Sequence, residues 1–274
     1  MVWRKKDTRT GAPVFRAPPG FRDSGRPIFG QGEVVNSTYQ IRQLLHGDDG
    51  GQVFEAWDML LERTVALKSA WRDDDVPPLL PEARAPSAIG APCVADVYGI
   101  GNHRGAEFLV AERIDGMALI QHVSQIYQDG ELLRGLRVIE LLSSIAQGLV
   151  AVHRAGYSVD RLSSANTIIS ESDRLVFAPF ALGQGQLDSK PPVFAPEIVT
   201  LGSMPESGSP AAVAVDLYAL GCIAVELCTA KPPFPGESVK ALRFAHIHHR
   251  PPQLALIRDD LPIELSDLVE ELMA

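Results

Sequence analysis

The stretch AVDLYALGCIAVELCTA (Ala214–Ala230) decides the character of the C-terminal half of this 274-residue chain. Its only charged residues are Asp216 and Glu226, and apolar side chains occupy positions all around a helix of this length. A surface helix keeps one polar face, whereas a helix that is apolar on every side is buried. The stretch therefore predicts a central helix inside a helical unit.

Helical spacing of apolar residues continues on both sides of this stretch. ELLRGLRVIELLSSIAQGLVAVHRAG (Glu131–Gly156) predicts a long helix that stops at the glycine. IELSDLVEELMA (Ile263–Ala274) begins another helix that runs to the end of the chain. The C-terminal part is therefore predicted to be predominantly helical.

The region before Glu131 shows short alternating runs that are typical of strands joined by turns. These runs are YQIRQLL (Tyr39–Leu45), GQVFEAWD (Gly51–Asp58), RTVALKSA (Arg63–Ala70), VADVYGIG (Val94–Gly101) and AEFLVAERI (Ala106–Ile114). We predict an α+β protein with an N-terminal arm over residues 1–36, a small β-rich lobe over 37–114 and a larger helical lobe over 115–274.

Charge is distributed unevenly along the chain. Residues 1–36 are rich in Gly, Pro and Arg and carry seven basic and three acidic residues, a net +4 within a chain of net charge −9. The absence of apolar periodicity predicts an arm without its own core, anchored through scattered aromatic residues. The acidic remainder argues against a nucleic-acid-binding surface.

The three cysteines Cys93, Cys222 and Cys228 are scattered and lie in apolar stretches. Free buried thiols are typical of a reducing compartment, so we expect a cytoplasmic protein. No apolar core follows the charged N-terminus, and no uninterrupted apolar run approaches the about 18 residues of a membrane span. A link to a membrane is expected only through segments outside this chain.

Five motifs, in order, resemble the protein kinase family, closest in style to bacterial serine/threonine kinases. They are VALK (Val65–Lys68), ERIDG (Glu112–Gly116), APE (Ala195–Glu197), DLYALG (Asp216–Gly221) and KPPFPG (Lys231–Gly236). The resemblance covers the chain from about Tyr39 onward and implies a bilobal fold with a nucleotide cleft between the lobes. It also implies a last helix that does not appear before Ala274, so we expect either a fragment of a longer protein or a fold that lacks this helix.

The catalytic loop departs from the family pattern. Aligned on Asn166, the family's H-R-D falls on Val159, Asp160 and Arg161, and the following lysine falls on Ser163. The guanidinium of Arg161 stays protonated and cannot accept a proton from a substrate hydroxyl. Asp160 lies one residue before the position of the base.

The metal-binding loop departs from the pattern as well. The resemblance places the family's Asp-Phe-Gly on Pro179, Phe180 and Ala181. Magnesium requires oxygen ligands, and proline has no side-chain oxygen. Asn166 is left as a single ligand, so we predict no metal site.

The phosphate-covering turn keeps only one of its three glycines. The family's glycine positions fall on His46, Asp48 and Gly51. Asp48 and Asp49 would lie near the nucleotide phosphates and repel them. An acidic hairpin turn also explains GDDGG fully.

The resemblance implies a residual nucleotide cleft built mainly from apolar and backbone-supporting positions. Its residues are Gly51, Val53, Ala66, Lys68, Glu82, Ala111, Glu112, Ile114, Asn166 and Ile168. The sequence leaves open whether Lys68 pairs with Glu82, because prolines at 77, 78, 81 and 86 limit the expected helix to about two turns.

Three histidines, His246, His248 and His249, have no flanking cysteine pair that would complete a zinc site. The resemblance places them beside a late C-lobe helix, so we expect them on the surface.

These departures predict a pseudokinase, which is not an enzyme and acts as a protein-binding scaffold or allosteric regulator. We expect no cofactor and at most weak, magnesium-independent ATP binding. The expected partners are other proteins, such as an active kinase or its substrate, and no nucleic acid. One alternative is an atypical active serine/threonine kinase that uses Asp160 as its base. Another is a platform for a partner-binding basic arm.

Overall fold

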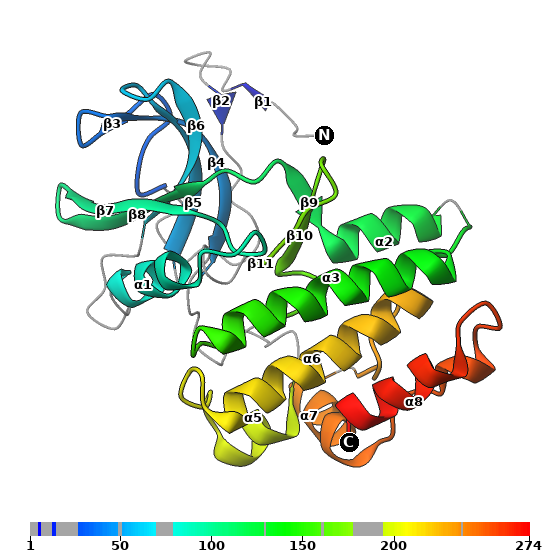
Figure 1. Ribbon diagram of the computed structural model, residues 1–274. Helices are drawn as coiled ribbons and strands as arrows, with labels where there is room; N and C mark the ends of the chain where they lie inside the picture. Colours follow the sequence, from blue (N-terminus) through cyan, green and yellow to red (C-terminus); the bar gives the residue numbers. More distant parts are fainter. Residues whose placement is uncertain are drawn as a thin grey trace.

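The computed structural model describes residues 5–6, 13–14, 27–48, 51–69, 79–128, 130–159, 162–177, 194–236 and 238–274. A curled β-sheet forms the N lobe and a group of helices forms the C lobe, as Figure 1 shows. This arrangement confirms the predicted α+β bilobal fold.

Six strands form an antiparallel N-lobe sheet. In sheet order they are β3 (Val34–Val35), β4 (Tyr39–Asp48), β5 (Gly51–Asp58), β6 (Arg63–Ser69), β8 (Ala106–Glu112) and β7 (Val97–His103). The five predicted strands are all present. A separate pair, β1 (Lys5–Lys6) and β2 (Pro13–Val14), precedes them.

Part of the predicted arm belongs to the N-lobe core. Phe29 is 1% exposed and packs in one cluster with Val35, Ile41 and Phe54. The Ile28 amide donates to Oε1 of the fully buried Gln52 at 2.6 Å. Residues 27–35 therefore fold with the lobe because their apolar side chains fill its interior.

Helix α1 (Leu80–Ile89) is longer than the predicted two turns. Pro81 lies in its first turn, where a missing N–H costs nothing, and Pro86 lies inside the helix. The helix ends at Gly90, whose left-handed φ of 56° suits glycine. The limit expected from the prolines was therefore wrong, because neither ring terminates the helix.

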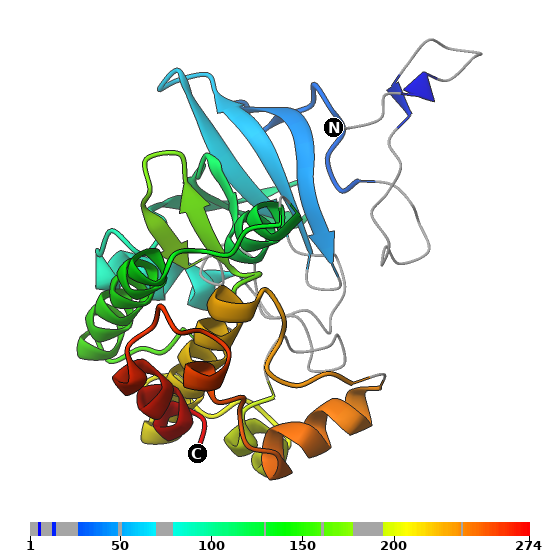
Figure 2. The same ribbon diagram turned by 90° about the vertical axis from the view of Figure 1, so that its right-hand side faces the viewer.

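The C lobe contains five longer helices and two short ones among the described residues. They are α2 (Leu119–Gln128), α3 (Gly135–Arg154), α5 (Pro196–Leu201), α6 (Pro210–Thr229), α7 (Val239–His248), the 3₁₀ helix η1 (Leu254–Leu256) and α8 (Ile263–Leu272). Figure 2 shows them below the N-lobe strands, with α5, α7 and α8 at the end of the molecule away from the sheet.

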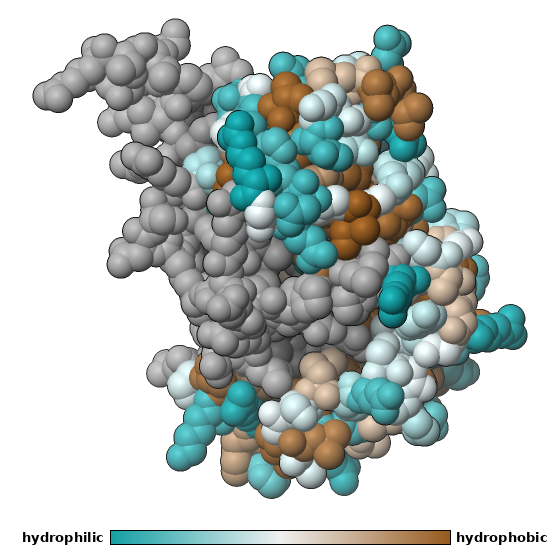
Figure 3. All heavy atoms as spheres, turned by 90° about the vertical axis from the view of Figure 1, so that its left-hand side faces the viewer, coloured by the Kyte–Doolittle hydropathy of each residue, from teal (hydrophilic) through white to brown (hydrophobic). Residues whose placement is uncertain are grey.

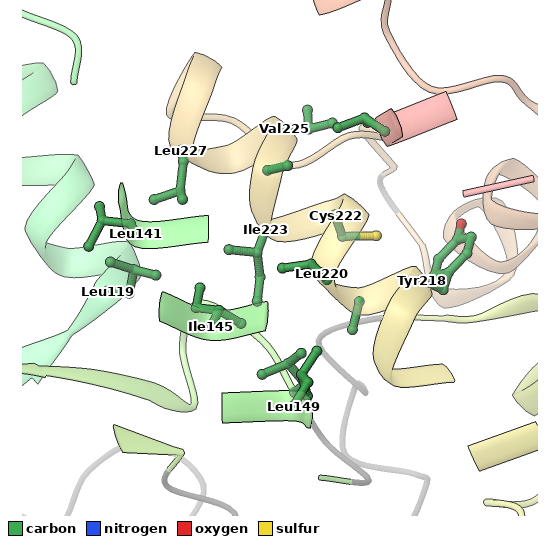
Figure 4. Packing of buried hydrophobic residues seen from close by; sticks show 14 of the residues in the cluster. Leu119, Leu141, Ile145, Leu149, Tyr218, Leu220, Cys222, Ile223, Val225 and Leu227 are labelled. Atoms are coloured by element: carbon green, nitrogen blue, oxygen red, sulfur yellow. The ribbon is translucent and has the colours of Figure 1, made fainter. Parts of the chain in front are cut away.

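Helix α6 is the centre of the C-lobe core, as predicted. Figure 4 shows its Leu220, Ile223 and Leu227 among side chains from α2 and α3. Helices α3 and α6 are long and apolar enough to cross a membrane by length and composition, with 44% and 72% of that apolar window buried inside the fold. Packing in this core accounts for their apolar composition.

A small sheet lies between the lobes. It consists of β11 (Leu175–Phe177), β10 (Thr167–Ser170) and β9 (Gly116–Ala118), all antiparallel.

On the side of the molecule formed by α1, β7 and β8, Figure 3 shows apolar patches among polar residues of the N lobe. Tyr98 and Ile100 of β7 are 39% and 40% exposed.

Candidate active site

Strands β5, β6 and β8 carry the residues that the resemblance assigns to the upper wall of a nucleotide cleft. Strand register places Val53 opposite Lys68 and Ala66 opposite Ala111. Val53, Lys68 and Ala111 are buried, and Ala66 is half-buried. These are the predicted positions for a base between apolar surfaces and for a phosphate-orienting lysine. The Glu82 side chain lies outside the described residues, so the Lys68–Glu82 pair stays a prediction.

The hinge follows β8 and is held by ion pairs. The two carboxylate oxygens of Glu112 accept hydrogen bonds from the two terminal guanidinium nitrogens of Arg174, at 2.6 and 2.8 Å. Hydrogen bonding by Arg174 is the main cause that lowers the pKa of Glu112. Arg113 pairs with Glu55 of β5 at 3.3 Å and donates to the carbonyl oxygen of half-buried Ile114. Charged side chains therefore brace the predicted hinge.

The lower wall comes from the small sheet. Ile168 pairs with Val176 on one side and with Ala118 on the other. Its side chain is half-buried, whereas its neighbour Ile169 is 6% exposed and belongs to the C-lobe core. Alternation along the strand therefore directs the two isoleucines to opposite faces.

The start of the catalytic loop is anchored to α6. The amide of Val159 donates to Oδ2 of Asp216 at 2.8 Å, and Nε2 of His153 lies 2.8 Å from the same oxygen. Asp216 is fully buried and Val159 is 1% exposed. A buried carboxylate requires such partners. The structure thus retains the support that the DLYALG motif predicted.

Hydrogen bonds that involve Ser163 stabilise the end of the catalytic loop. Oγ of Ser163 accepts the amide of Asn166 at 3.1 Å, and Oγ1 of Thr167 donates to the Ser163 carbonyl at 2.9 Å. Ser163 is 3% exposed. The serine at the family's lysine position therefore stabilises the turn that carries Asn166, which is half-buried.

The next serine, Ser164, donates to Oε2 of Glu226 on α6. Burial raises the pKa of Glu226, while this hydrogen bond lowers it. A second carboxylate of the central helix thus supports the same loop.

Several predicted departures lie outside the described residues. Asp160 and Arg161 fall in the gap after Val159, and Pro179, Phe180 and Ala181 fall in the gap after Phe177. The phosphate-covering turn is described up to Asp48 and again from Gly51, whose backbone pairs with Asp48. The predicted roles of these residues stay predictions.

His246 is not on the surface, contrary to expectation. It is 8% exposed and lies against the rings of Tyr218, Phe194 and Phe234, with centroids 4.9 to 5.8 Å away. The Tyr218 hydroxyl lies 2.8 Å from its Nδ1. Burial lowers the pKa of His246 to about 4. It is buried because it lies on the inner face of α7, whereas His248 and His249 are exposed.

Among the described residues, no group of three or more His, Cys, Asp or Glu side chains could hold a metal ion. All three cysteines are free; Cys222 and Cys228 are buried, and Cys93 is half-buried.

Sequence reasoning missed the supporting residues of this site. His153 is one basic residue at the end of a helix, and Arg174 is one basic residue in a turn. Their partners Asp216 and Glu112 lie 63 and 62 residues away along the chain. No local pattern could have paired them, because the first contact depends on how α3 packs against α6 and the second on how the small sheet meets the hinge.

Comparisons with known proteins support a kinase relationship. The chain matches no protein-family model. It is 25% identical to the probable serine/threonine-protein kinase pknA2 of Bifidobacterium longum over 88% of this chain and 33% of the relative. It is 27% identical to the serine/threonine-protein kinase PknE of Mycobacterium tuberculosis over 86% of this chain and 42% of the relative. The chain thus spans well under half the length of these relatives.

Solved structures share the fold. The PknI kinase domain of Mycobacterium tuberculosis superposes with a TM-score of 0.66 and 19% identity, over 90% of this chain and 91% of that domain. At this identity the likeness concerns the fold alone.

The relatives also correct one prediction. The expectation that this chain is not an enzyme rested on Arg161 and Pro179, but sequence relatives that match across most of the chain are named serine/threonine-protein kinases. Departures at single positions do not outweigh that similarity. The chain therefore resembles bacterial serine/threonine protein kinases in sequence and shares the protein kinase fold.

Proposed function

We propose that this chain is an atypical protein kinase domain that transfers the γ-phosphoryl group of ATP to a hydroxyl group of another protein. The observation that carries the proposal is the retained anchor of the catalytic loop, in which buried Asp216 binds both the Val159 amide and His153. Asp160 follows Val159 directly in the sequence. This fixed start to the loop is the support for assigning the proton acceptor to Asp160.

The proposed reaction needs one proton acceptor and a positioned nucleotide. The acceptor oxygen forms a bond to the γ-phosphorus, the bond from that phosphorus to the bridging oxygen breaks, and ADP leaves. The hydroxyl proton passes to the carboxylate of Asp160. Catalysis of this kind depends mainly on positioning and on charge stabilisation. Lys68, on β6 beside Val53, supplies the cation for the phosphates.

Magnesium fits the residues of this chain poorly. The family's metal-binding aspartate is replaced by Pro179, which leaves the amide oxygen of Asn166 as a ligand. We therefore assign no step to a metal ion and expect ATP to bind weakly and largely independently of magnesium.

The proposed acceptor is a protein in the cytoplasm. The whole chain has a net charge of −9 and its arm has +4, so the body carries −13, which disfavours nucleic acid as a partner. The role of that arm as a partner-binding segment stays a prediction.

The test is transfer of ³²P from labelled ATP to a mixture of basic protein substrates by the purified full chain. Transfer is measured with magnesium, with manganese and with a chelator. We expect Asp160→Asn and Lys68→Ala to lower the rate by at least about 100-fold, which is the scale of general-base and electrostatic contributions.

The matched control is Asp259→Asn, which removes an exposed carboxylate of the C lobe. Its rate should equal that of the wild-type chain. The proposal is overturned if the wild-type chain transfers no phosphate under any of the three conditions, or if Asp160→Asn retains full activity.

A further inference from the structure

Three segments of the chain meet behind the hinge at the guanidinium of Arg174. This residue lies in the turn between β10 and β11, on the C-lobe side. Its two terminal nitrogens donate to the two carboxylate oxygens of Glu112, at 2.6 and 2.8 Å. Its Nε donates to the carbonyl oxygen of Pro92 at 2.6 Å. One side chain therefore ties the small sheet to the hinge and to the segment after α1.

The carboxylate and the backbone of Glu112 are both restrained. Oε2 of Glu112 accepts the amide of Asp96 at 3.3 Å, and the amide of Glu112 donates to the carbonyl oxygen of Asp96 at 2.8 Å. A bidentate pair between a carboxylate and an arginine fixes orientation as well as distance. Glu112 therefore has little freedom to rotate while Arg174 holds it.

A second connection between the lobes, made by backbone atoms, involves the same segment that Arg174 contacts. The amide of Phe177 donates to the carbonyl oxygen of Cys93 at 2.7 Å, and Val94 and Phe177 form an isolated bridge. Phe177 is fully buried. The segment 92–94 is thus attached to the small sheet at both Arg174 and Phe177.

We propose that Arg174 is a positioning residue for nucleotide binding, which fixes the hinge through Glu112 and holds the two lobes at one separation. The inference rests on the proposed function, because it assumes that ATP binds between the lobes. The resemblance to kinases assigns the backbone of Glu112–Ile114 to the edge that a nucleotide base would meet. A hinge already held in one geometry loses little conformational entropy when a base binds. A released hinge has to be ordered on binding, and that entropy loss weakens the affinity.

The same turn offers a matched control. Asp173, next to Arg174, forms an ion pair with Arg137 of α3. This pair lies within the C lobe and touches neither the hinge nor segment 92–94. The side chain of Arg137 is 29% exposed and that of Arg174 is 32% exposed. Arg137 also forms an ion pair with Glu140 of the same helix at 3.2 Å. Removing either arginine therefore breaks half-exposed ionic contacts, but only those of Arg174 reach the hinge.

The test measures binding of the fluorescent analogue MANT-ATP to the full chain and to Arg174→Met, Glu112→Gln, the double variant and Arg137→Met. We expect Arg174→Met and Glu112→Gln each to raise the Kd about 5- to 20-fold, the lower part of the usual range for coupling between sites. Because the two residues act as one unit, the double variant should bind no more weakly than either single variant. Arg137→Met should stay within twofold of the wild type.

A second readout separates positioning from general loss of stability. The melting temperature should fall in both Arg174→Met and Arg137→Met, since each variant loses half-exposed ionic contacts. Hydrogen exchange at the amides of Asp96 and Glu112 should accelerate only in Arg174→Met and Glu112→Gln. In the transfer assay, Arg174→Met should raise the KM for ATP more than it lowers kcat, and Arg174→Lys should restore part of the affinity.

The outcomes distinguish this inference from the proposed function. If wild-type protein binds MANT-ATP and Arg174→Met binds it equally well, or no worse than Arg137→Met, only the role of Arg174 is overturned. If wild-type protein binds no MANT-ATP, the nucleotide site itself fails, and the positioning role is overturned with it.

Discussion

The floor and the hinge of the inter-lobe cleft are held together in different ways. On the floor, Asp216 is fully buried and binds the Val159 amide and His153 beneath the catalytic loop. At the hinge, the side chains of Glu112 and Arg174 are 23% and 32% exposed. When a buried bond is broken, the partner that remains has no water to bond to, whereas partly exposed charges are rehydrated and screened by salt. The floor contacts should therefore contribute more to the free energy of unfolding. The hinge contacts should mainly fix the position of Glu112 relative to the two lobes.

The largest expected loss of stability comes from removing the buried carboxylate that holds the floor. Asp216→Ala leaves the Val159 amide and His153 without their shared acceptor in a buried site, so we expect a loss of about 3 kcal/mol in the free energy of unfolding. Urea denaturation monitored by tryptophan fluorescence measures it. Asp259→Ala, at an exposed carboxylate, should change stability by less than about 0.5 kcal/mol. A loss below about 1 kcal/mol in Asp216→Ala would show that the floor is not held by this carboxylate.

The next effect appears when the pH falls. The pKa of His246 is lowered to about 4 in the folded chain, because the ring is buried against Tyr218, Phe194 and Phe234. The unfolded chain therefore takes up this proton near pH 6.5, and the folded chain does so only near pH 4. Stability is lost as the pH falls through this window, by about 2 kcal/mol between pH 7.5 and pH 5.

The measurement compares urea midpoints of the wild type and of His246→Gln at both pH values. The glutamine keeps a hydrogen-bonding group near Tyr218 but does not titrate. The difference in stability between the two proteins should shrink or reverse at the lower pH. An equal loss in both would mean that other groups cause the acid sensitivity.

A smaller effect concerns packing between α3 and the small sheet. A Cβ atom on Gly148 would lie 2.8 Å from the ring of Phe177 and 3.0 Å from Cβ of Cys93. Gly148→Ala gains helix propensity but overpacks a buried contact, so we expect a net loss of about 1 kcal/mol. Chemical denaturation checks this, with Gln147→Ala at an exposed position of the same helix as the control. A stabilised Gly148→Ala variant would show that Phe177 moves aside without cost.

The smallest effect on stability is expected at the hinge. Glu112→Gln should cost no more than about 1 kcal/mol, because the pair with Arg174 is partly exposed. That cost should diminish as sodium chloride is raised from 0.05 to 1 M, since salt screens the pair. A loss above about 2 kcal/mol that salt does not change would place the hinge in the same class as the floor.

Much of the fold follows from local patterns. Strands β4, β5, β6, β7 and β8 and helices α3, α6 and α8 were predicted from the period of their apolar residues. Helix α3 begins at Gly135 rather than at Glu131, because Oδ2 of Asp260 accepts the Gly135 amide at 2.8 Å. That contact joins residues 125 positions apart, so no local pattern could reveal it.

The candidate site was predicted in part. Val53, Lys68 and Ala111 lie on neighbouring strands, and Asp216 accepts the Val159 amide, while the nucleotide-binding roles that the resemblance implies stay predictions. The resemblance did not reveal the Glu112–Arg174 pair or the contact between Ser164 and Glu226. These contacts involve single polar residues without periodicity, which become partners only when distant segments are brought together.

The sequence by itself determined which segments are helices or strands, that α6 is buried, and that a cation and a proline replace two acidic residues of the family. Those features depend on the spacing of apolar residues and on the identity of side chains, and both are local properties. Only the tertiary structure decided that His246 is buried, that α1 continues through Pro86, and that Arg174 reaches the hinge. Such outcomes depend on which surfaces meet, because the energy of a polar or charged side chain is set by the groups that surround it after folding.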